Sequence, residues 1–472
     1  MKKFGIRDKI GYMFGDFGND FFFVSVGTFL TVFYTDVLGI DGAIIGLLFL
    51  VARVWDAFTD VAMGRIVDTV NPAKDGKFRP WIRRMAVPLV ISGVILFLPV
   101  TGLSYSMKIA FAVITYIIYG LMYTAINIPY GSMAAAITDD PAQRASLSTF
   151  RNIGSSISSA LVNTLIPLVA FVTVVTAKGE EVEVIDGTRL FIIMVIFGVC
   201  ALVCYYFCHK LCTERIESKV MTKQEQKEKN TTGLKIALKG IVHNRPLIAL
   251  LACAIVLLLS QQIVGSMNTY VYKDYFHESG LLSIAGLLMT IGTFACAPFV
   301  STIVRKWGKK ESIIFASSLA AFFYILLGIL HVSNVWVYLA LSMCATFGAA
   351  YFNTVVWAVV LDVIDYQEYE TGQRDDATVY AVYSFSRKVG QALAGGLGGI
   401  SLSLVGYISS TAGHNVVQST ATVNNIYNVA TFLPGVTYLL IAVIMFFGYP
   451  LTKRKLAELN VALAKRRAAE AK

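Results

Sequence analysis

The sequence predicts an all-α membrane protein whose helices cross the bilayer many times. Of its 472 residues, 56% are hydrophobic and only 15% are charged, and the mean hydropathy is +0.65. Soluble domains rarely have this composition. Many separate apolar runs also approach the roughly 20 residues that a membrane-spanning helix needs. Hydrocarbon offers the backbone no hydrogen-bond partners, and the sequence lacks the alternation of barrel strands, so we expect the spans to be helices.

Twelve apolar runs form two sets of six, separated by a charged, lysine-rich segment. We expect a six-helix bundle over 1–211, a cytosolic linker over 212–244, a second six-helix bundle over 245–450 and a basic cytosolic tail over 451–472. A polar loop at 178–188 joins the fifth and sixth runs. The first-half runs lie near 9–37, 43–63, 85–103 and 108–133, then one begins near 144 and one ends near 211; the second-half runs lie near 246–272, 281–304, 312–331, 336–364, 378–408 and 425–447.

The formal net charge is +10, but the distribution of basic residues does not indicate a nucleic-acid partner. Lysine and arginine crowd the short loops of one side, such as 65–84 and 305–310, which indicates that these loops are cytosolic. An even number of spans places both termini on that side. The N-terminus lacks a cleavable signal. We therefore expect a multi-pass protein of the cell membrane with cytosolic termini.

The second apolar run carries three charges in the stretch 51–60. A charge at bilayer depth costs at least about 2.5–3.5 kcal/mol, so an ionisable residue there is a functional candidate. At about 100° per residue, Arg53, Asp56 and Asp60 fall on one helix face. Two carboxylates one turn apart, beside an arginine, are suited to hold a proton or a small cation in a polar cavity. The alternative is a structural cluster of ion pairs between helices.

Other ionisable residues also lie inside predicted spans, notably Asp20, Arg151 and Lys388. Each charge is costly in isolation, whereas acids and bases in one water-lined cavity neutralise one another. Together with Arg53 they form a predicted charge network. Cation binding at the two carboxylates of the second span would loosen ion pairs in this network and reorder a neighbouring substrate site. This hypothesis describes a cation-coupled transporter.

Five motifs follow one another over nearly the whole chain. They are Gly11-Tyr12 through Asp20, Arg53-Val54-Trp55-Asp56-Ala57-Phe58-Thr59-Asp60, Gly76-Lys77-Phe78-Arg79-Pro80-Trp81, Asn127-Ile128-Pro129-Tyr130-Gly131-Ser132, and Asp365-Tyr366-Gln367-Glu368-Tyr369 with Thr371-Gly372 and Arg374. In order and spacing they resemble the glycoside–pentoside–hexuronide:cation symporter family of the major facilitator superfamily. The resemblance implies the major facilitator fold, with twelve transmembrane helices in two bundles, and symport of a sugar or glycoside with H+ or Na+.

The resemblance also implies roles for individual residues. Carboxylates of the second helix bind the cation, and two polar residues of the fourth helix link cation and sugar. An acid of the first helix and an arginine of the fifth bind the sugar, and a lysine of the eleventh helix lies beside the cation site. The cation-binding positions are thus Asp56, Asp60, Thr124 and Asn127, and the substrate-binding positions include Asp20, Asn127, Arg151, Ser384 and Lys388.

Two charge features bear on the ion and the substrate. Melibiose permease, a member of that family, has an acid where this chain has Asn127, so the cation site carries one less negative charge. An amide oxygen still ligates Na+, but a proton becomes at least as plausible as the coupling ion. Asp20 would repel a nearby uronate, which favours a neutral glycoside or pentoside. The alternative is a glucuronide or hexuronide, with Arg151 or Lys388 binding its acid group.

The aromatic clamp of melibiose permease is missing, because Gly131 and Asn353 stand where that protein has tryptophans. Tyr123, Phe352 and Trp357 are candidates to stack on a sugar instead, and Asn353 is a candidate for substrate binding. The alternative for each aromatic residue is ordinary packing.

A cluster of charges marks the point where the tenth span leaves the membrane. Basic residues of facing loops are expected to pair with it in one state of the carrier and to separate in the other. The candidate gate on the cytosolic side comprises Asp362, Asp365, Glu368 and Arg374. The alternative is that these are solvated loop charges.

Other functional classes are less consistent with the sequence. A lipid or lysolipid carrier of the same superfamily is the main competitor. An enzyme would need a nucleophile or metal constellation, and the sequence contains no HExxH and no GxSxG motif. We read the small-residue run 392–399 and the cysteines at 200, 204, 208 and 212 as helix-packing features. We expect no cofactor, no structural metal, no partner beyond substrate and membrane lipids, and a monomer.

Overall fold

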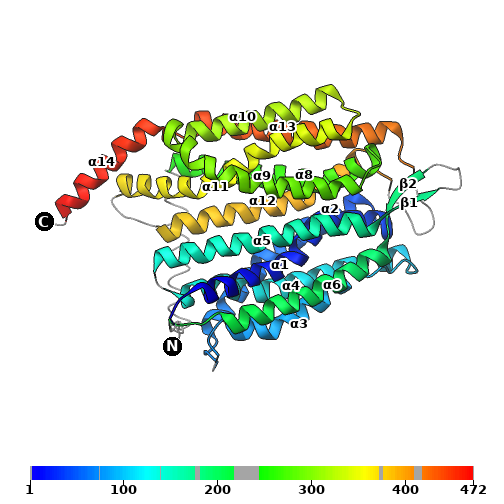
Figure 1. The fold of residues 1–472 in the computed structure, drawn as a ribbon, viewed down its shortest axis with the longest axis horizontal. Coiled ribbons are helices and arrows are strands. Elements are labelled where there is room, and N and C mark those ends of the chain that lie inside the picture. Colours follow the sequence, from blue (N-terminus) through cyan, green and yellow to red (C-terminus); the bar gives the residue numbers. More distant parts are fainter. Residues whose placement is uncertain are drawn as a thin grey trace. The chain divides into compact units, whose positions relative to one another are not determined.

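The computed structural model describes residues 3–73, 75–138, 140–175, 181–216, 244–371, 376–408 and 417–470. These residues form long helices and one short hairpin (Figure 1). The chain divides into two compact units. Unit 1 comprises Met1–Glu225, Asn268–Leu287 and Gly398–Val423, and unit 2 comprises Gln226–Met267, Leu288–Leu397 and Asn424–Lys472.

In the described ranges, six α-helices precede the predicted linker and seven follow it, the last being α14 in the basic tail. This confirms the expected all-α fold. The elements before the linker are α1 (Ile6–Val32), η1 (Phe33–Val37), α2 (Gly42–Thr69), α3 (Arg79–Ile95), α4 (Tyr105–Ile137), α5 (Pro141–Ala170), β1 (Phe171–Val175), β2 (Glu181–Ile185) and α6 (Gly187–Leu211). Those after it are α8 (Arg245–Tyr270), η2 (Val271–Tyr275), α9 (Gly280–Trp307), α10 (Lys309–Leu330), α11 (Val335–Thr371), α12 (Asp376–Leu404), α13 (Thr420–Val443), η3 (Ile444–Gly448) and α14 (Lys453–Glu470). The η segments are π-helical turns.

Nine helical segments within the described ranges are long and apolar enough to cross a membrane. The apolar segments of α3, α9 and α12 are shorter. α3 has 17 residues in all, the apolar part of α9 is Gly280–Gly292, and that of α12 is Val389–Leu404. The lipid-facing side of a span is clearest on α6. Its exposed apolar stripe consists of Ile192, Ile196, Val199 and Val203, whose spacing follows one helix face.

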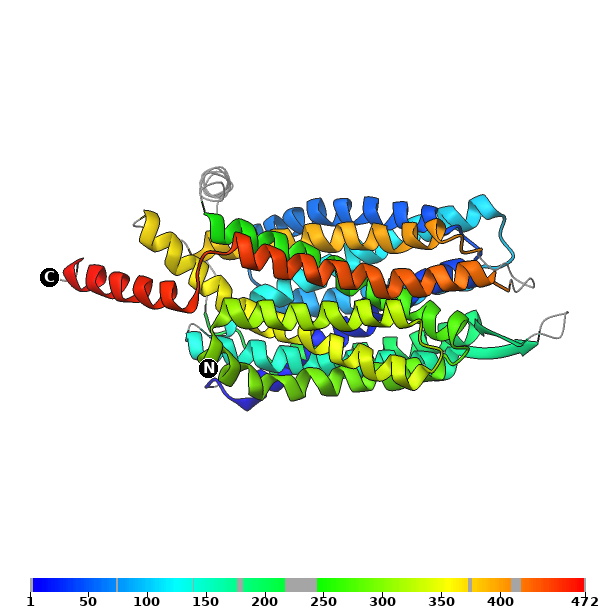
Figure 2. The ribbon, with the colours of Figure 1, turned by 90° about the horizontal axis from the view of Figure 1, so that it is seen from above.

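Two elements differ from the sequence expectation. The loop between α5 and α6 contains an antiparallel hairpin, in which Phe171 lies opposite Ile185, whereas we expected only a polar loop. β-branched residues predominate in both strands, Phe-Val-Thr-Val-Val and Glu-Val-Glu-Val-Ile, and favour the pairing. The basic tail contains the helix α14, which extends beyond the end of α13 and lies against α10 and α11 (Figure 2). The surface helix considered for the linker falls outside the described residues.

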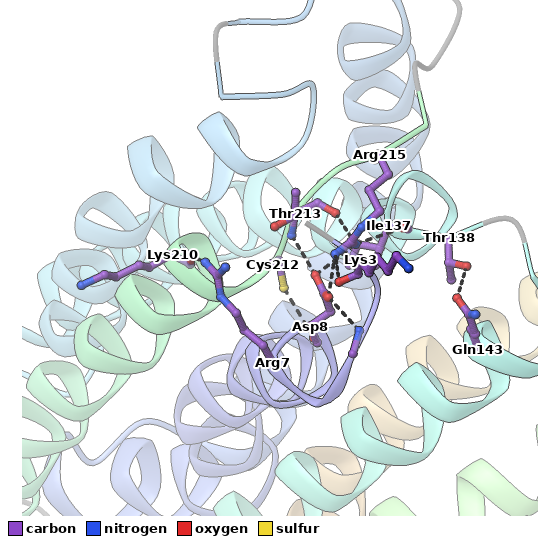
Figure 3. A network of polar contacts seen from close by, with 11 residues as sticks. Lys3, Arg7, Asp8, Ile137, Thr138, Gln143, Lys210, Cys212, Thr213 and Arg215 are labelled. Carbon is purple, nitrogen blue, oxygen red and sulfur yellow. Dashed lines mark hydrogen bonds and ion pairs between the residues drawn. The ribbon is translucent and has the colours of Figure 1, made fainter. Parts of the chain in front are cut away.

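In unit 1, α1 packs against α5 and α6, while α4 contacts α2 and α3. The start of the predicted linker is also bound to this unit (Figure 3). The two guanidinium nitrogens of Arg215, Nη1 and Nη2, lie 3.1 and 2.8 Å from the two carboxylate oxygens of Asp8. The Thr213 N–H donates to the same carboxylate at 3.1 Å. Because Asp8 is buried, this bidentate pair fixes the residues after α6 to the beginning of α1.

A second anchor explains the motif at residues 76–81. The Glu214 carboxylate accepts the backbone N–H groups of Lys77, Phe78 and Arg79 at 2.7, 2.9 and 2.8 Å. These donors open α3, where the N–H groups of a helix have no intrahelical partners and attract an anion. Gly76 precedes them with a φ of +116°, and a Cβ there would lie 2.6 Å from the Glu214 carboxyl carbon. Only glycine fits this position without strain.

Unit 2 has its own apolar core, to which α8, α10, α11 and α13 contribute. Leu250, Ile313, Val359 and Ile441 are buried members of this core, one from each helix. The core holds α11, the longest helix of the unit, in place. The predicted gate residues Asp362, Asp365 and Glu368 lie on the last turns of that helix.

Candidate functional site

Two parallel contacts join α1 to α5 inside unit 1. Arg151 Nε donates to Asp16 Oδ2 at 2.7 Å, and Ser155, one turn later on α5, donates to Asp20. The guanidinium carbon of Arg151 lies 5.4 Å from the ring centroid of Tyr130. The predicted sugar-binding residues Asp20 and Arg151 are therefore neighbours. With two acids and one base, this group has a formal charge of −1 and offers acceptors to hydroxyl groups.

The helix 2 carboxylates both face α4. Thr124 Oγ1 donates to Asp60 Oδ1 at 2.8 Å, and a Cβ placed on Gly120 would lie 2.8 Å from Asp56 Oδ1. Arg53 Nη1 lies 3.7 Å from Asp56 Oδ2, and the two side chains are only 21% and 25% exposed. The predicted face of Arg53, Asp56 and Asp60 is thus directed at a neighbouring helix.

Helix α4 carries two further predicted site residues. Asn127 lies one turn beyond Thr124 and is half-buried. Tyr123 stacks on Phe23 of α1, with ring centroids 5.6 Å apart, and lies 5.9 Å from the Tyr119 ring. Its contact with Phe23 holds the Tyr123 ring against α1, the helix that carries Asp16 and Asp20.

The remaining predicted substrate residues belong to unit 2. Asn353 Nδ2 donates to Ala349 O of its own helix at 3.1 Å. Trp357 packs edge-on against Tyr383 at 5.4 Å, and the guanidinium of Arg387 lies 5.6 Å from its ring centroid. The side chains of Ser384 and Lys388 lie outside the described residues, although their backbones belong to α12.

The candidate gate is also in unit 2. Lys309 Nζ lies 2.6 Å from Asp362 Oδ1 and donates to Ala358 O at 3.1 Å, which ties the start of α10 to α11. Asp365 and Glu368 follow on α11 and are half-buried. Arg374 lies outside the described residues. The function of these charges as a gate stays a prediction.

Sequence reasoning missed three residues of the unit 1 site: Asp16, Ser155 and Gly120. Asp16 had a detectable signal, because it is an intramembrane acid one turn before Asp20. It also changes the expected charge network, since the close carboxylate partner of Arg151 is Asp16. Ser155 and Gly120 carry no charge, and only the packing of the helices shows what they contact.

The oxygen atoms around Asp56 and Asp60 are of the type that binds Na+, and a carboxylate also binds a proton. Among the residues that the structure describes, no three His, Cys, Asp or Glu side chains gather closely enough to hold a metal ion. The candidate ion site comprises the two carboxylates on α2 and the hydroxyl of Thr124 on α4. That the amide of Asn127 joins them stays a prediction.

Comparison with known proteins places the chain among transporters. The model of the family described as MFS/sugar transport protein matches residues 11–453. The chain is 32% identical over 462 residues to the glucuronide carrier protein homolog of Escherichia coli (strain K12), covering 98% of this chain and 96% of that protein. It is 29% identical over 444 residues to the isoprimeverose transporter of Lactiplantibacillus pentosus, covering 93% and 88%.

A solved structure confirms the architecture. The fold is similar to that of the xylose transporter XylE from E. coli in its inward-open conformation, with a TM-score of 0.60 and 14% identity, covering 97% of this chain and 98% of that chain. Together, the family match, the relatives and this fold show that the chain is a membrane-spanning transporter with the major facilitator fold. Its motifs, its family match and its relatives agree that it is a member of the glycoside–pentoside–hexuronide:cation symporter family.

Proposed function

We propose that the protein carries a neutral sugar or glycoside into the cell together with H+ or Na+, with both termini in the cytosol. The hydrogen bond between Asp60 and Thr124 carries this proposal, because it connects the candidate ion site on α2 to the helix that also bears Tyr123 and Asn127. When an ion binds to the carboxylates, the negative charge on Asp60 is compensated and its hydrogen bond with Thr124 weakens. Ion binding therefore affects α4, which lies next to the helices of the sugar-binding residues.

The charge balance on α1 and α5 supports a neutral substrate. Asp16 compensates the positive charge of Arg151, and Asp20 adds a further negative charge nearby. A uronate placed there would meet uncompensated repulsion. A glucuronide is the second candidate, because one relative is named a glucuronide carrier protein homolog; in that case Arg151 or Lys388 would bind the acid group. A lipid or lysolipid carrier is the third candidate.

The decisive test is uptake of matched substrate pairs by membrane vesicles that contain the protein. A neutral glucoside, a xyloside and a glucuronide with the same aglycone would be compared, each with and without sodium and at two external pH values. The proposal expects saturable uptake of a neutral glycoside that an imposed ion gradient raises. Preferential uptake of the glucuronide would contradict the neutral substrate. Competition by a lysolipid, without competition by any sugar, would contradict sugar transport.

The proposal includes no catalytic step and no cofactor beyond the coupling ion. Every role assigned here to a side chain is binding or charge compensation. We further propose that the carrier works as a monomer surrounded by lipid. Light scattering of the protein in detergent, corrected for bound detergent, would give the mass of one chain, 51.6 kDa, in that case. A doubled mass would contradict it.

A further inference from the structure

The first helix of each half of the chain ends in the same unusual turn. α1 continues into η1 and α8 into η2, and each η segment is a π-helical turn of five residues. Both turns are closed by the same backbone pattern: Leu38 N–H donates to Phe33 O and Ile40 N–H to Tyr34 O, while Phe276 N–H donates to Val271 O and Glu278 N–H to Tyr272 O. Both then contain a left-handed residue, Gly39 or His277. Such turns are rare and often mark functional sites.

The two turns share a tyrosine and an aspartate but differ at the residue between them. Their sequences are Phe-Tyr-Thr-Asp-Val and Val-Tyr-Lys-Asp-Tyr. The first therefore contributes Thr35 and Asp36, and the second contributes Lys273 and Asp274. Because Lys273 stands at the position equivalent to Thr35, the second turn presents a positive charge to Asp36 of the first.

A buried polar cluster joins these turns within unit 1. Lys273 forms an ion pair with Asp36 and donates to Tyr407 Oη at 2.8 Å. Tyr407 in turn donates to Asp36 Oδ1 at 2.8 Å, which closes a triangle. Only 4% of the Lys273 side chain and 2% of the Asp36 side chain are exposed. Tyr270 and Thr35, which share a 3.0 Å hydrogen bond, cover the cluster.

Other contacts reinforce the same end of unit 1. The Ser279 N–H donates to Glu183 of the hairpin at 2.7 Å, and Ser283 donates to Thr164 O of α5 at 2.8 Å. Gly399, in the small-residue run of α12, lies so close to α2 that a Cβ would be 2.5 Å from Gly46 N. All these contacts join the first half of the chain to segments of the second half. Both η1 and η2 contact β2 of the hairpin, which lies at the end of unit 1 opposite the N-terminus (Figure 1).

We propose that Asp36, Lys273 and Tyr407 form an outer lock, which holds the external entrance of the carrier closed and breaks whenever the carrier opens outward. The proposal rests on the orientation proposed above, in which the end opposite the termini faces outside. A buried ion pair is costly to break by removing one partner, because the other charge is left uncompensated. Loss of either charge therefore shifts the carrier toward states in which the cluster is hydrated.

The two aspartates are expected to respond in opposite ways. Asp36 bridges separate segments, because it binds Lys273 and Tyr407 from a different part of the chain. Asp274 is the sequence neighbour of Lys273, and its Oδ2 lies 3.4 Å from the Lys273 Nζ, within the same turn. Its charge therefore adds repulsion to Asp36 without holding segments together. Asp36→Asn should open the lock, whereas Asp274→Asn should leave it closed or tighten it.

The test measures exposure to the outside and does not require uptake. Gly27 lies two turns beyond Asp20 on the same face of α1, and a Cβ there meets no atom within 4 Å. A Gly27→Cys variant in right-side-out vesicles would be labelled with a membrane-impermeant maleimide, and the parent chain would give the background of its seven cysteines. Adding Lys273→Met or Asp36→Asn should raise the labelling rate of position 27 by about tenfold, which corresponds to a modest population shift.

Two further variants make the result specific. Tyr407→Phe removes one hydroxyl and should give a smaller increase. Arg189→Met breaks an exposed ion pair with Asp186, at 57% and 36% side-chain exposure, and should change nothing. Unchanged labelling in both Lys273→Met and Asp36→Asn, or an increase in Asp274→Asn equal to that in Asp36→Asn, would overturn the lock. If the charge variants fail to reach the membrane, unchanged labelling in Tyr407→Phe would overturn it.

A failure of the lock is distinguishable from a failure of the proposed transport. If the chain transports no sugar, the labelling rates still report whether the cluster controls access. If sugar uptake is normal but the labelling pattern is absent, the transport proposal stands and the lock does not.

Discussion

The two acids of α1, Asp16 and Asp20, have different partners and therefore different roles. Asp16 is bound by the Arg151 guanidinium, while Asp20 accepts a hydrogen bond from the Ser155 hydroxyl. Arg151 brings a positive charge to Asp16 as well as a hydrogen bond, whereas Ser155 is neutral and leaves the charge of Asp20 uncompensated. Asp16 therefore positions Arg151, and Asp20 keeps more of its acceptor capacity for a ligand.

Replacing Asp16 should weaken sugar binding through Arg151. Asp16→Asn leaves a partly buried guanidinium without its charge partner, so we expect sugar affinity to fall by at least about tenfold, or about 1.4 kcal/mol. Binding of the transported sugar to purified protein, measured by calorimetry, would test this. Asp16→Asn combined with Arg151→Gln should recover thermal stability but not affinity. Recovery of both would assign the pair a purely structural role.

We expect a substitution of Gly120 to weaken ion binding more than sugar binding. A methyl group there would displace the Asp56 carboxylate, since a Cβ would lie 2.8 Å from its Oδ1. We expect Gly120→Ala to raise the ion concentration for half-maximal uptake by about tenfold, equivalent to about 1.4 kcal/mol. The matched control is Gly265→Ala, where a Cβ meets no atom within 4 Å. Equal ion dependence in the two variants would show that Asp56 does not contact the ion.

At the scale of elements, the loop between α2 and α3 depends on one glycine. Gly76→Ala meets both a positive φ and the Glu214 carboxylate, so we expect a loss of about 1–3 kcal/mol of stability. Gly64→Ala lies in open space within α2 and should stabilise the helix by up to about 1 kcal/mol. Thermal unfolding in detergent compares the two variants. A melting temperature for Gly76→Ala at or above that of Gly64→Ala would show that the anchor is dispensable.

The same loop should respond to acid. Burial acts to raise the pKa of Asp75, but hydrogen bonds, including that with His209, and the charge of Arg83 outweigh it, so the pKa lies below its ordinary value. A depressed carboxylate pKa stabilises the fold above the unfolded value of about 3.9, and the contribution disappears as pH falls through the folded value. Asp75→Asn should therefore cost less than about 1 kcal/mol at pH 7. Its melting temperature should converge with that of the parent as the pH falls below the folded-state pKa of Asp75; a gap that widens toward acid would contradict this assignment.

Most helices follow from composition and period, because long apolar runs have one stable form in a bilayer. The face that carries Asp56 and Asp60 follows from the helical repeat alone. The pairing of Arg151 with Asp16 cannot be predicted in this way, because the sequence does not show which of several acids lies next to Arg151 once the helices pack. Asp36 and Lys273 had no signal either, because charges at span ends are common and only their burial shows that they form a cluster. The hairpin was missed because two five-residue strands are too short to distinguish from a helix end and a polar loop.

At the scale of the molecule, coupling requires that ion binding on α2 alters the helices that bind sugar. α4 provides the physical connection within unit 1, since it contacts α2, α1 and α5. Thr124 donates a hydrogen bond to Asp60, so a change in the charge of Asp60 acts on α4. The next residue on α4 toward the N-terminus, Tyr123, contacts Phe23 and connects α4 to α1. A neutral substrate adds no charge of its own, so ion occupancy alone sets the charge of this path.

Removing the ion-binding carboxylates should separate accumulation from exchange. In Asp56→Asn or Asp60→Asn the site is neutralised at that position in every state, so an ion gradient no longer drives the cycle. We expect accumulation in vesicles to fall by more than about tenfold, while sugar exchange across the membrane continues, because exchange needs no net return of the empty carrier. Asp41→Asn is the matched control: Asp41 caps α2 through a 2.8 Å contact with Ala43 N–H, and asparagine caps as well as aspartate. Accumulation at the parental level in both helix 2 variants would exclude these carboxylates from coupling, whereas loss of accumulation in Asp41→Asn would show that the assay reports damage to α2 instead of loss of the ion.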